Sequence, residues 1–199
     1  MQQHDSTISF YDEHADAFIA NTLEVDMQNL YSHFLPLLPK KSHILDAGCG
    51  SGRDSRYFLK HGYQVTAADG SAELVKSAST FIGQPVTHCL FQEIQADSLF
   101  DAIWACASLL HVPSYQLPEV FLHLAKQIKP QGIFYCSFKL GDDDTEREGR
   151  YFTNANEARL QQFIYNAPLT IEKIWLTDDV RPDRKGERWL NAILRKNNE

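Results

Sequence analysis

One stretch of the sequence has the residue types and the spacing that suit the binding of a polar ligand. The segment Asp-Ala-Gly-Cys-Gly-Ser-Gly at 46–52 places three glycines at alternate positions, directly after a short apolar run. Glycine serves where the backbone turns sharply or approaches another group closely, because it has no Cβ. The order strand, glycine-rich turn, helix brings backbone N–H groups and a helix amino end beside an anionic or polar ligand. Dinucleotide loops have the spacing Gly-x-Gly-x-x-Gly, so the different spacing here argues against a pyrophosphate site.

A carboxylate follows at the end of the next predicted strand. Asp69 closes the run at 64–69, and Gly70 and Ser71 complete the turn after it. An acid in this position can accept hydrogen bonds from both hydroxyls of a ribose. The glycine loop and Asp69 together therefore predict a site for a ligand that contains a ribose.

The elements that position these residues alternate between short apolar runs and helical patterns from residue 42 onward. This alternation is typical of β-α-β units and of a mostly parallel sheet. Only residues 177–187 separate the last two predicted strands, which leaves no room for a crossover helix and predicts an antiparallel pair. Apolar spacing around 10–18 predicts a helix outside this α/β core. The predicted strands are 43–46, 64–69, 85–91, 101–106, 133–138, 169–176 and 188–194, and the predicted helices are 53–61, 71–82, 117–128 and 154–167.

Composition places the chain among ordinary globular proteins with one domain. It has 199 residues, 43% of them hydrophobic and 23% charged, which argues against disorder and coiled coil. The net charge of −7 gives a long nucleic-acid duplex or an anionic membrane no general electrostatic reason to bind. The longest apolar run, 102–110, is too short to span a bilayer, and the amino terminus lacks the features of a signal peptide. We therefore expect a cytoplasmic protein.

Cysteine and histidine spacing argues against a metal site. The four cysteines are widely spaced and include no Cys-x-x-Cys pair, so we interpret them as buried reduced thiols. Apart from His111, the histidines show no spacing typical of metal ligands and are interpreted as surface or structural residues.

The segment at 46–52, with Asp69 at the end of the following strand, resembles the S-adenosylmethionine site of the class I methyltransferases. The resemblance covers residues 42–199 and includes the antiparallel pair of final strands. It implies a Rossmann-like α/β fold, with a seven-stranded mixed sheet, helices on both faces and the last strand antiparallel. Residues 1–41 would then form an N-terminal helical cap on a domain at 42–199. Residues 50–55, Gly-Ser-Gly-Arg-Asp-Ser, are similar to those of bacterial tellurite-resistance-type and other small-molecule methyltransferases.

The same resemblance implies S-adenosyl-L-methionine as the cofactor and assigns its binding residues. The glycine loop would meet the methionine part, Asp69 would hold the ribose, and residues 92–94 would lie by the adenine. Many members have Asp where this chain has Gln92 followed by Glu93. The implied cofactor residues are Asp46, Gly48, Cys49, Gly50, Gly52, Arg53, Asp69, Gly70, Ser71, Gln92, Glu93, Ile94, Ala105 and Cys106.

Methyl transfer from a sulfonium needs few catalytic residues, because the cofactor already carries the activation. The protein holds donor and acceptor in line and takes a proton where the acceptor is protonated. Ligands bind at the carboxyl ends of strands in open α/β sheets, so the segment 105–111 is expected beside the methyl group. It lacks the Asn/Asp-Pro-Pro-aromatic and Pro-Cys motifs of two nucleic-acid-modifying classes. His111 is the predicted general base, since histidine titrates near neutral pH; the alternative is a histidine that only bonds the backbone.

Three further residues are predicted to meet the acceptor. Arg150 and Arg181 lie in two loops, 139–150 and 177–187, that are expected to overhang the same end of the sheet. Converging guanidinium groups favour a carboxylate or another oxyanion; the alternative is a pair of solvated loops, which the neighbouring aspartates favour. Tyr11 belongs to a segment that is either a lid over the pocket or a packing helix.

The leading hypothesis is therefore an S-adenosylmethionine-dependent methyltransferase that acts on a small molecule, with an anionic acceptor as one alternative. Methylation of a protein or of exposed nucleic-acid bases is an alternative within the enzymes, but the sequence shows neither an added recognition domain nor a strongly basic face. A third hypothesis is a protein that binds the cofactor without consuming it. A nicotinamide dehydrogenase ranks last, because the loop spacing argues against it.

Overall fold

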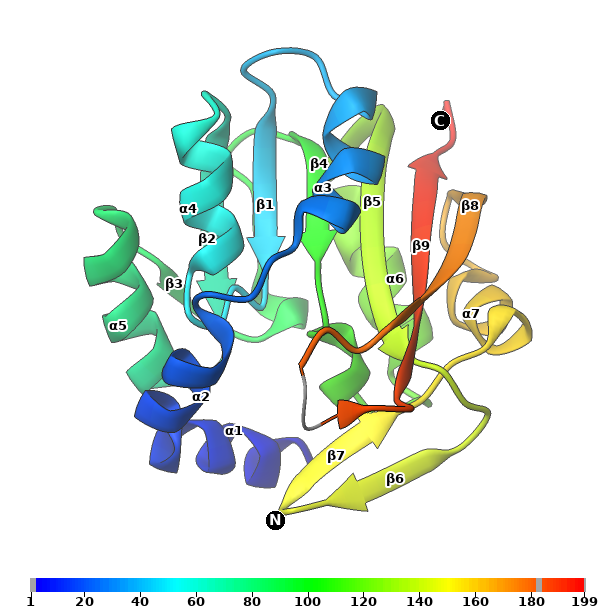
Figure 1. The fold of residues 1–199 in the computed structure, drawn as a ribbon. Helices are drawn as coiled ribbons and strands as arrows, with labels where there is room; N and C mark the ends of the chain where they lie inside the picture. The colour runs from blue at the N-terminus through cyan, green and yellow to red at the C-terminus, as the bar shows by residue number, and fades with distance from the viewer. Residues whose placement is uncertain (1–2, 182–183, 199) are drawn as a thin grey trace.

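The structure is a computed structural model that describes residues 3–181 and 184–198, with side chains described from residue 6 onward. A seven-stranded sheet forms the centre of the molecule, with strand order β3-β2-β1-β4-β5-β9-β8 (Figure 1). Strand β9 runs antiparallel to both of its neighbours, and the other adjacent pairs are parallel. The sheet strands are β1 (His43–Ala47), β2 (Gln64–Asp69), β3 (Thr87–His88), β4 (Phe100–Ala105), β5 (Ile128–Lys139), β8 (Leu169–Asp178) and β9 (Arg188–Lys196).

Helices cover both faces of this sheet, so the predicted mixed α/β fold is confirmed. One buried cluster lies between the sheet and the helices α6 and α7, and a second lies on the opposite face against α3 and α4. The central strands are buried on both faces, as their continuous apolar runs predict. The longer helices are α1 (Gln3–Glu13), α2 (Ala15–Thr22), α3 (Gln28–Phe34), α4 (Arg53–Lys60), α5 (Ala72–Ile82), α6 (Leu117–Lys126) and α7 (Glu157–Ile164), with 3-10 turns at Leu35–Leu37, Phe91–Glu93 and Leu109–His111.

The helix predicted at 71–82 is present as α5, with a cap residue at each end. The Ser71 side chain accepts a hydrogen bond from the amide of Leu74, and Gly83 ends the helix with φ of 77°. These are the usual N-cap and C-cap devices, which satisfy orphan backbone groups at helix ends. Because Ser71 lies two residues after the end of β2 and its amide donates to the Asp69 carboxylate, this cap also fixes the turn after Asp69.

The amino-terminal segment forms three helices, where the sequence pattern predicted one. His14 has φ of −118° and ψ of 20°, outside the helical range, so the chain bends between α1 and α2. Its Nδ1 lies 2.9 Å from the Phe10 carbonyl oxygen and its ring stacks on that of Phe10. Both helices lie at the carboxyl edge of the sheet (Figure 1), whereas α3 packs on the sheet face through Tyr31 and Phe34.

Two other local predictions were wrong. The polar stretch expected as a loop at 141–149 contains a hairpin instead, made of β6 (Asp144–Arg147) and β7 (Arg150–Thr153). Its turn residues Glu148 and Gly149 both have positive φ, 54° and 77°, which is the geometry of the two-residue turns that suit hairpins. The third sheet strand is only Thr87–His88, because this edge strand gives way at once to the 3-10 turn Phe91–Glu93.

Candidate cofactor and acceptor site

The glycine loop lies between β1 and α4, and each of its three alternate glycines has positive φ. Gly48, Gly50 and Gly52 have φ of 78°, 55° and 79°, values that side chains with a Cβ rarely adopt. A Cβ on Gly48 would lie 2.4 Å from the Cβ of Ser108, and one on Gly50 would lie 3.0 Å from the ring of Phe18. The glycines are thus required by the turn and by close packing against the protein itself.

Asp69 connects this loop to the end of β2. Its carboxylate accepts a hydrogen bond from the Gly50 amide at 2.8 Å and another from the Ser71 amide at 2.9 Å. Burial raises the pKa of Asp69, and the surrounding backbone N–H groups oppose that shift. A carboxylate offers about four acceptor positions, so Asp69 retains lone pairs for a diol such as ribose.

Two cavities meet above the loop. The larger has a volume of about 580 Å³ and extends toward β8 and β9; the smaller, of about 90 Å³, lies beside Asp69. Apolar residues Leu74, Leu90, Phe91 and Ile94 line the smaller one. The two cavities share Tyr11, Phe18, Gly48, Gly50, Ala107 and His111.

The amino-terminal helices form one wall of the smaller cavity, which Thr7, Ile8, Tyr11 and Phe18 line. Asp12 accepts a hydrogen bond from the Ser71 hydroxyl at 2.6 Å and from the Glu73 amide at 3.2 Å. Thr7 accepts from the Tyr151 amide at 3.0 Å, which attaches α1 to the hairpin. Helix α1 therefore contacts both the start of α5 and strand β7.

A buried carboxylate organises the start of α4. Asp54 accepts from Arg53 Nε at 2.6 Å and Nη2 at 3.0 Å, from the Tyr31 hydroxyl at 2.6 Å and from Trp104 Nε1 at 2.8 Å. Burial opposes its ionisation, but Arg53 and the other donors outweigh burial and lower the pKa of Asp54. Asp46 lies nearby, bonded to the Ser55 hydroxyl at 2.6 Å, and burial together with the Asp54 charge raises its pKa.

His111 is held in one orientation by bonds at both ring nitrogens. Nδ1 lies 2.8 Å from the Tyr151 carbonyl oxygen, and Nε2 lies 2.8 Å from the Tyr11 hydroxyl. A carbonyl oxygen only accepts, so Nδ1 carries the hydrogen, and in the neutral ring Nε2 then has the lone pair that accepts from Tyr11. Burial raises the pKa of Tyr11, while the neighbouring Arg150 lowers it. A basic nitrogen therefore faces the point where the cavities meet.

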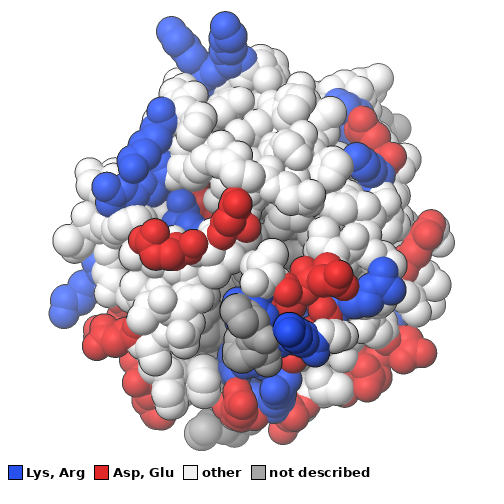
Figure 2. Space-filling model, viewed as in Figure 1, with Lys and Arg blue, Asp and Glu red and all other residues white. Residues whose placement is uncertain are grey.

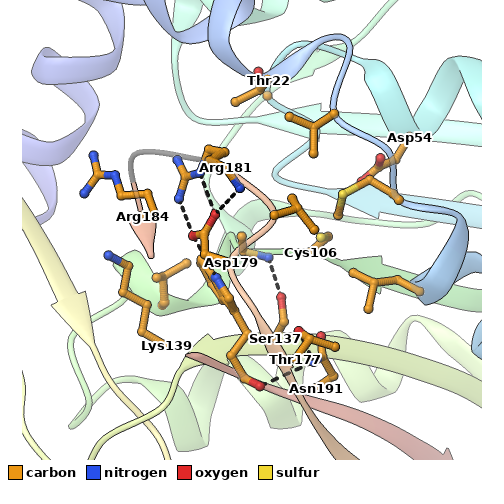
Figure 3. A pocket seen from close by; sticks show the side chains of 18 of the residues that line it. Thr22, Asp54, Cys106, Ser137, Lys139, Thr177, Asp179, Arg181, Arg184 and Asn191 are labelled. Carbon is orange, nitrogen blue, oxygen red and sulfur yellow. Dashed lines mark hydrogen bonds and ion pairs between the residues drawn. The ribbon is translucent and has the colours of Figure 1, made fainter. Parts of the chain in front are cut away.

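The cations at the wall of the larger cavity are mostly paired with carboxylates. Arg181 binds Asp179 through Nε at 3.0 Å and Nη2 at 2.7 Å, and Lys139 lies 2.7 Å from Glu187. In Figure 3, Arg181 points at Asp179, with Arg184 and Lys139 on the same side of the cavity and Asp54 across from them. Figure 2 shows basic and acidic side chains mixed at the lower centre of this face, so neither sign of charge predominates there. The predicted arginines, Arg150 and Arg181, thus line the cavity, and so does Asp179, whereas Glu148 and Glu187 are not among its lining residues.

The Asp179 pair predicts a specific pH dependence of stability. The Asp179 side chain is 2% exposed; burial opposes ionisation, but bonds from Arg181 and Trp189 outweigh it and lower its pKa to about 2. A depressed pKa contributes stability above the unfolded pKa of about 4, and this contribution is lost as pH falls through the folded value. We expect Asp179→Asn to lower the free energy of unfolding by a constant amount above about pH 5, and by less as pH falls toward about 2.

Urea unfolding of both proteins across this pH range measures that difference. Asp178→Asn is the control, because the Asp178 side chain is 89% exposed and its loss is expected to change the free energy of unfolding by less than about 0.5 kcal/mol. A difference for Asp179→Asn that stays the same from pH 7 to the acid limit would contradict the assignment.

Most of the residues predicted for the site line one of the two cavities. Those that do are Tyr11, Gly48, Cys49, Gly50, Arg53, Asp69, Gly70, Ser71, Ile94, Cys106, His111, Arg150 and Arg181. Asp46, Gly52, Gln92, Glu93 and Ala105 are not among the lining residues. Asp46 and Ala105 are buried, Gly52 packs against Ile82 and Ala78, and the side chains of Gln92 and Glu93 are exposed.

Sequence reasoning missed several lining residues. Phe18, Leu74, Leu90 and Phe91 cover the smaller cavity, and Trp189 lines the larger. Phe91 directly precedes the stretch 92–94 that was predicted to lie by the adenine, and Ile94 of that stretch lines the same cavity. Phe18 and Trp189 are far from the glycine loop in sequence, and no local pattern marks them.

Comparison with known proteins agrees with this geometry. A family model described as a methyltransferase domain matches residues 11–173. The ubiquinone biosynthesis O-methyltransferase of Rickettsia felis is 31% identical over 120 residues, which cover 58% of this chain and 48% of the relative. The malonyl-[acyl-carrier protein] O-methyltransferase of Enterobacter lignolyticus is 32% identical over 96 residues, covering 46% of this chain and 37% of the relative. The chain thus spans about half or less of the length of these curated relatives.

Solved structures share the whole fold at low sequence identity. A Burkholderia thailandensis 1,6-didemethyltoxoflavin-N1-methyltransferase, with 1,6-didemethyltoxoflavin and S-adenosylhomocysteine bound, superposes with a TM-score of 0.74 at 23% identity, covering 98% of this chain and 87% of that one. The magnesium protoporphyrin IX methyltransferase of Synechocystis, with S-adenosylmethionine bound, gives 0.72 at 16% identity, covering 98% of both chains. The sheet order, the glycine loop and Asp69 define a Rossmann-like methyltransferase domain. The chain belongs to the class I S-adenosylmethionine-dependent methyltransferases.

Proposed function

We propose that this chain transfers a methyl group from S-adenosylmethionine to a small-molecule acceptor. The observation that carries the proposal is the Asp69 carboxylate, bonded to the Gly50 amide at 2.8 Å beside the junction of the two cavities. Family membership supports the cofactor. The larger cavity, about 580 Å³, is within the size range of small-molecule sites.

The residues at the site fit this cofactor. Asp69 has acceptor capacity for the ribose hydroxyls, and the apolar lining beside it, with Leu90 and Phe91, suits a flat base. Arg53 and the loop residues 48–51 line the larger cavity, where the methionine part would lie. S-adenosylmethionine supplies, when bound, a methyl group already activated on a positively charged sulfur. The protein is then left to orient the acceptor and to take its proton.

His111 supports proton removal from the acceptor. Its Nε2 accepts from the Tyr11 hydroxyl, and that hydroxyl has lone pairs for a further donor. An acceptor O–H or N–H group that donates to Tyr11 is therefore connected to His111, while the Tyr151 carbonyl holds the ring. Proton transfer of this kind contributes about 100-fold to 10,000-fold in rate.

Other chemistry finds less support. Cys106 lines the larger cavity, but burial, aided by the charge of Asp54, raises the pKa of its thiol to about 12, which disfavours it as a nucleophile. Within residues 3–181 and 184–198, no group of three potential ligands is placed to hold a metal ion. None of the helices described there is long and apolar enough to cross a membrane.

Several finer assignments belong to the same proposal. We propose residues 1–41 as a cap over a domain at 42–199, although the family match begins earlier, at residue 11. The similarity of residues 50–55 to tellurite-resistance-type enzymes, a cytoplasmic location and the absence of a nucleic-acid partner stay predictions from the sequence.

Titration calorimetry with S-adenosylmethionine, S-adenosylhomocysteine and NAD tests the cofactor. Incubation with isotopically labelled S-adenosylmethionine and a pool of small metabolites then tests transfer, followed by mass spectrometry of the labelled product. Binding of both sulfur nucleosides without NAD binding, together with labelled product, is the expected result. His111→Gln is expected to bind S-adenosylhomocysteine but to lose most transfer. Binding without any consumption of cofactor would instead favour a non-catalytic binding protein.

A further inference from the structure

Arg150 stands out among the cations of the larger cavity. It begins β7, directly after the hairpin turn, and its side chain is 14% exposed. Its guanidinium carbon lies 4.4 Å from the ring centre of Phe10 and 5.4 Å from that of Phe152. Such contacts hold a guanidinium in place. Arg150 also lines the cavity together with Tyr11 and His111.

The hydrogen bonding of Arg150 is incomplete. Nη2 donates to Glu148 at 2.6 Å, whereas Nε is buried and has no hydrogen-bond partner among the residues that the structure describes. These two nitrogens form one fork of the guanidinium, which a carboxylate can accept in a bidentate manner. Glu148 accepts from only one of these two nitrogens, Nη2. An unpaired buried donor lowers stability, so a second acceptor at this fork would be favourable.

The present partner of Arg150 is also easily displaced. The Glu148 side chain is 55% exposed, and ion pairs with an exposed partner contribute little because solvent screens them. Arg181, by contrast, is held through two nitrogens by the buried Asp179, and Lys139 lies against a carboxylate shared with Arg147.

We propose that Arg150 binds a carboxylate group of the methyl acceptor, and that Glu148 occupies this position until the acceptor displaces it. This inference rests on the proposed function, since it names the chemical class of the acceptor. A carboxylic acid bound at the fork would lie beside the Tyr11 hydroxyl, whose pKa Arg150 influences. Its nucleophilic group would then be near the proton path to His111. The acceptor is thus an acid that carries its methylated group elsewhere, within the reach of a small molecule.

Binding of benzoate, measured by calorimetry with saturating S-adenosylhomocysteine, tests the proposal. We expect Arg150→Gln to weaken benzoate binding at least tenfold, because a bidentate charged contact is lost. Glu148→Gln is expected to strengthen it several-fold, since a neutral amide competes less for the guanidinium. Benzamide, which is neutral, should bind equally to wild type and to Arg150→Gln.

The matched control is Arg195→Gln, which removes the same charge at a residue that lines neither cavity and that pairs with Glu172 of β8. It should leave benzoate affinity within about twofold of wild type. No benzoate binding to wild type, or an equal loss in both arginine variants, would overturn the proposal. Failure of the proposed function would show separately, as absence of S-adenosylhomocysteine binding, and benzoate is therefore also titrated without it.

Discussion

Asp69→Ala is expected to weaken the binding of S-adenosylmethionine and S-adenosylhomocysteine at least tenfold, which corresponds to about 1.4 kcal/mol. Two effects add. The substitution removes the acceptor for the ribose hydroxyls, and it removes the carboxylate that holds the Gly50 and Ser71 amides at 2.8 and 2.9 Å. The loop that lines both cavities then keeps its backbone hydrogen bonds from Gly48 and Cys49 to the Ala68 carbonyl oxygen of β2 but loses its side-chain contact with the end of that strand. Titration calorimetry with both sulfur nucleosides measures the change.

Glu93→Ala is the matched control for this prediction. Glu93 was also assigned to the cofactor from the sequence, but its side chain is exposed and accepts from the Leu90 amide at 2.8 Å. We expect its removal to change cofactor affinity less than about twofold. Equal losses in the two variants would contradict the placement of the ribose at Asp69, and no loss in Asp69→Ala would contradict it directly.

The parts of the site that could be predicted depend on local pattern. Strand β2 runs over Gln64–Asp69 as predicted, because its apolar run ends in an acid that is followed by a turn glycine, Gly70, and then by the cap residue Ser71. The glycine loop was recognised for the same reason, since positive φ and strand-turn-helix order are encoded within a few residues. These short-range features predicted where the loop and Asp69 lie without information on the rest of the chain.

The features that escaped prediction depend on contacts between distant residues. Tyr11 and His111 are 100 positions apart, and Thr7 and Tyr151 are 144 apart. Strand β6 is exposed along its whole length, so it has no hydrophobic alternation to reveal it. A local pair can also escape prediction. The sequence allowed Arg181 to face either a ligand or Asp179, because the two charges lie only two positions apart. Only the fold decides between these two outcomes.

The hairpin joins the parts of the site that were predicted separately. The Tyr151 amide donates to Thr7 of the cap, and its carbonyl accepts from His111. One residue of β7 thus fixes the orientation of the predicted base and attaches α1. Arg150 precedes it directly and contacts Phe10 of the same helix. The residue proposed to bind the acceptor therefore belongs to one short strand that also contacts the predicted base and helix α1.

Asp54→Ala is expected to lower the free energy of unfolding by about 3–5 kcal/mol, a large part of the stability of about 5–15 kcal/mol that is usual for a domain. The Asp54 side chain is 7% exposed and that of Arg53 is 19% exposed. Its removal leaves the guanidinium without its carboxylate, and it leaves Tyr31 and Trp104 without the acceptor they share. Urea unfolding at neutral pH measures the loss.

The chain offers a matched control in the Glu172–Arg195 pair, which has the same two-nitrogen geometry at 2.7 and 3.0 Å but is 39% and 34% exposed. Glu172→Ala should cost less than about 1 kcal/mol, because solvent screens such a pair. The double variant Arg53→Met/Asp54→Leu is expected to recover part of the loss, since it removes the uncompensated cation. A loss for Asp54→Ala no greater than that for Glu172→Ala would show that this carboxylate does not hold α3, α4 and β4 together. A double variant as unstable as Asp54→Ala would instead assign the loss to Tyr31 and Trp104.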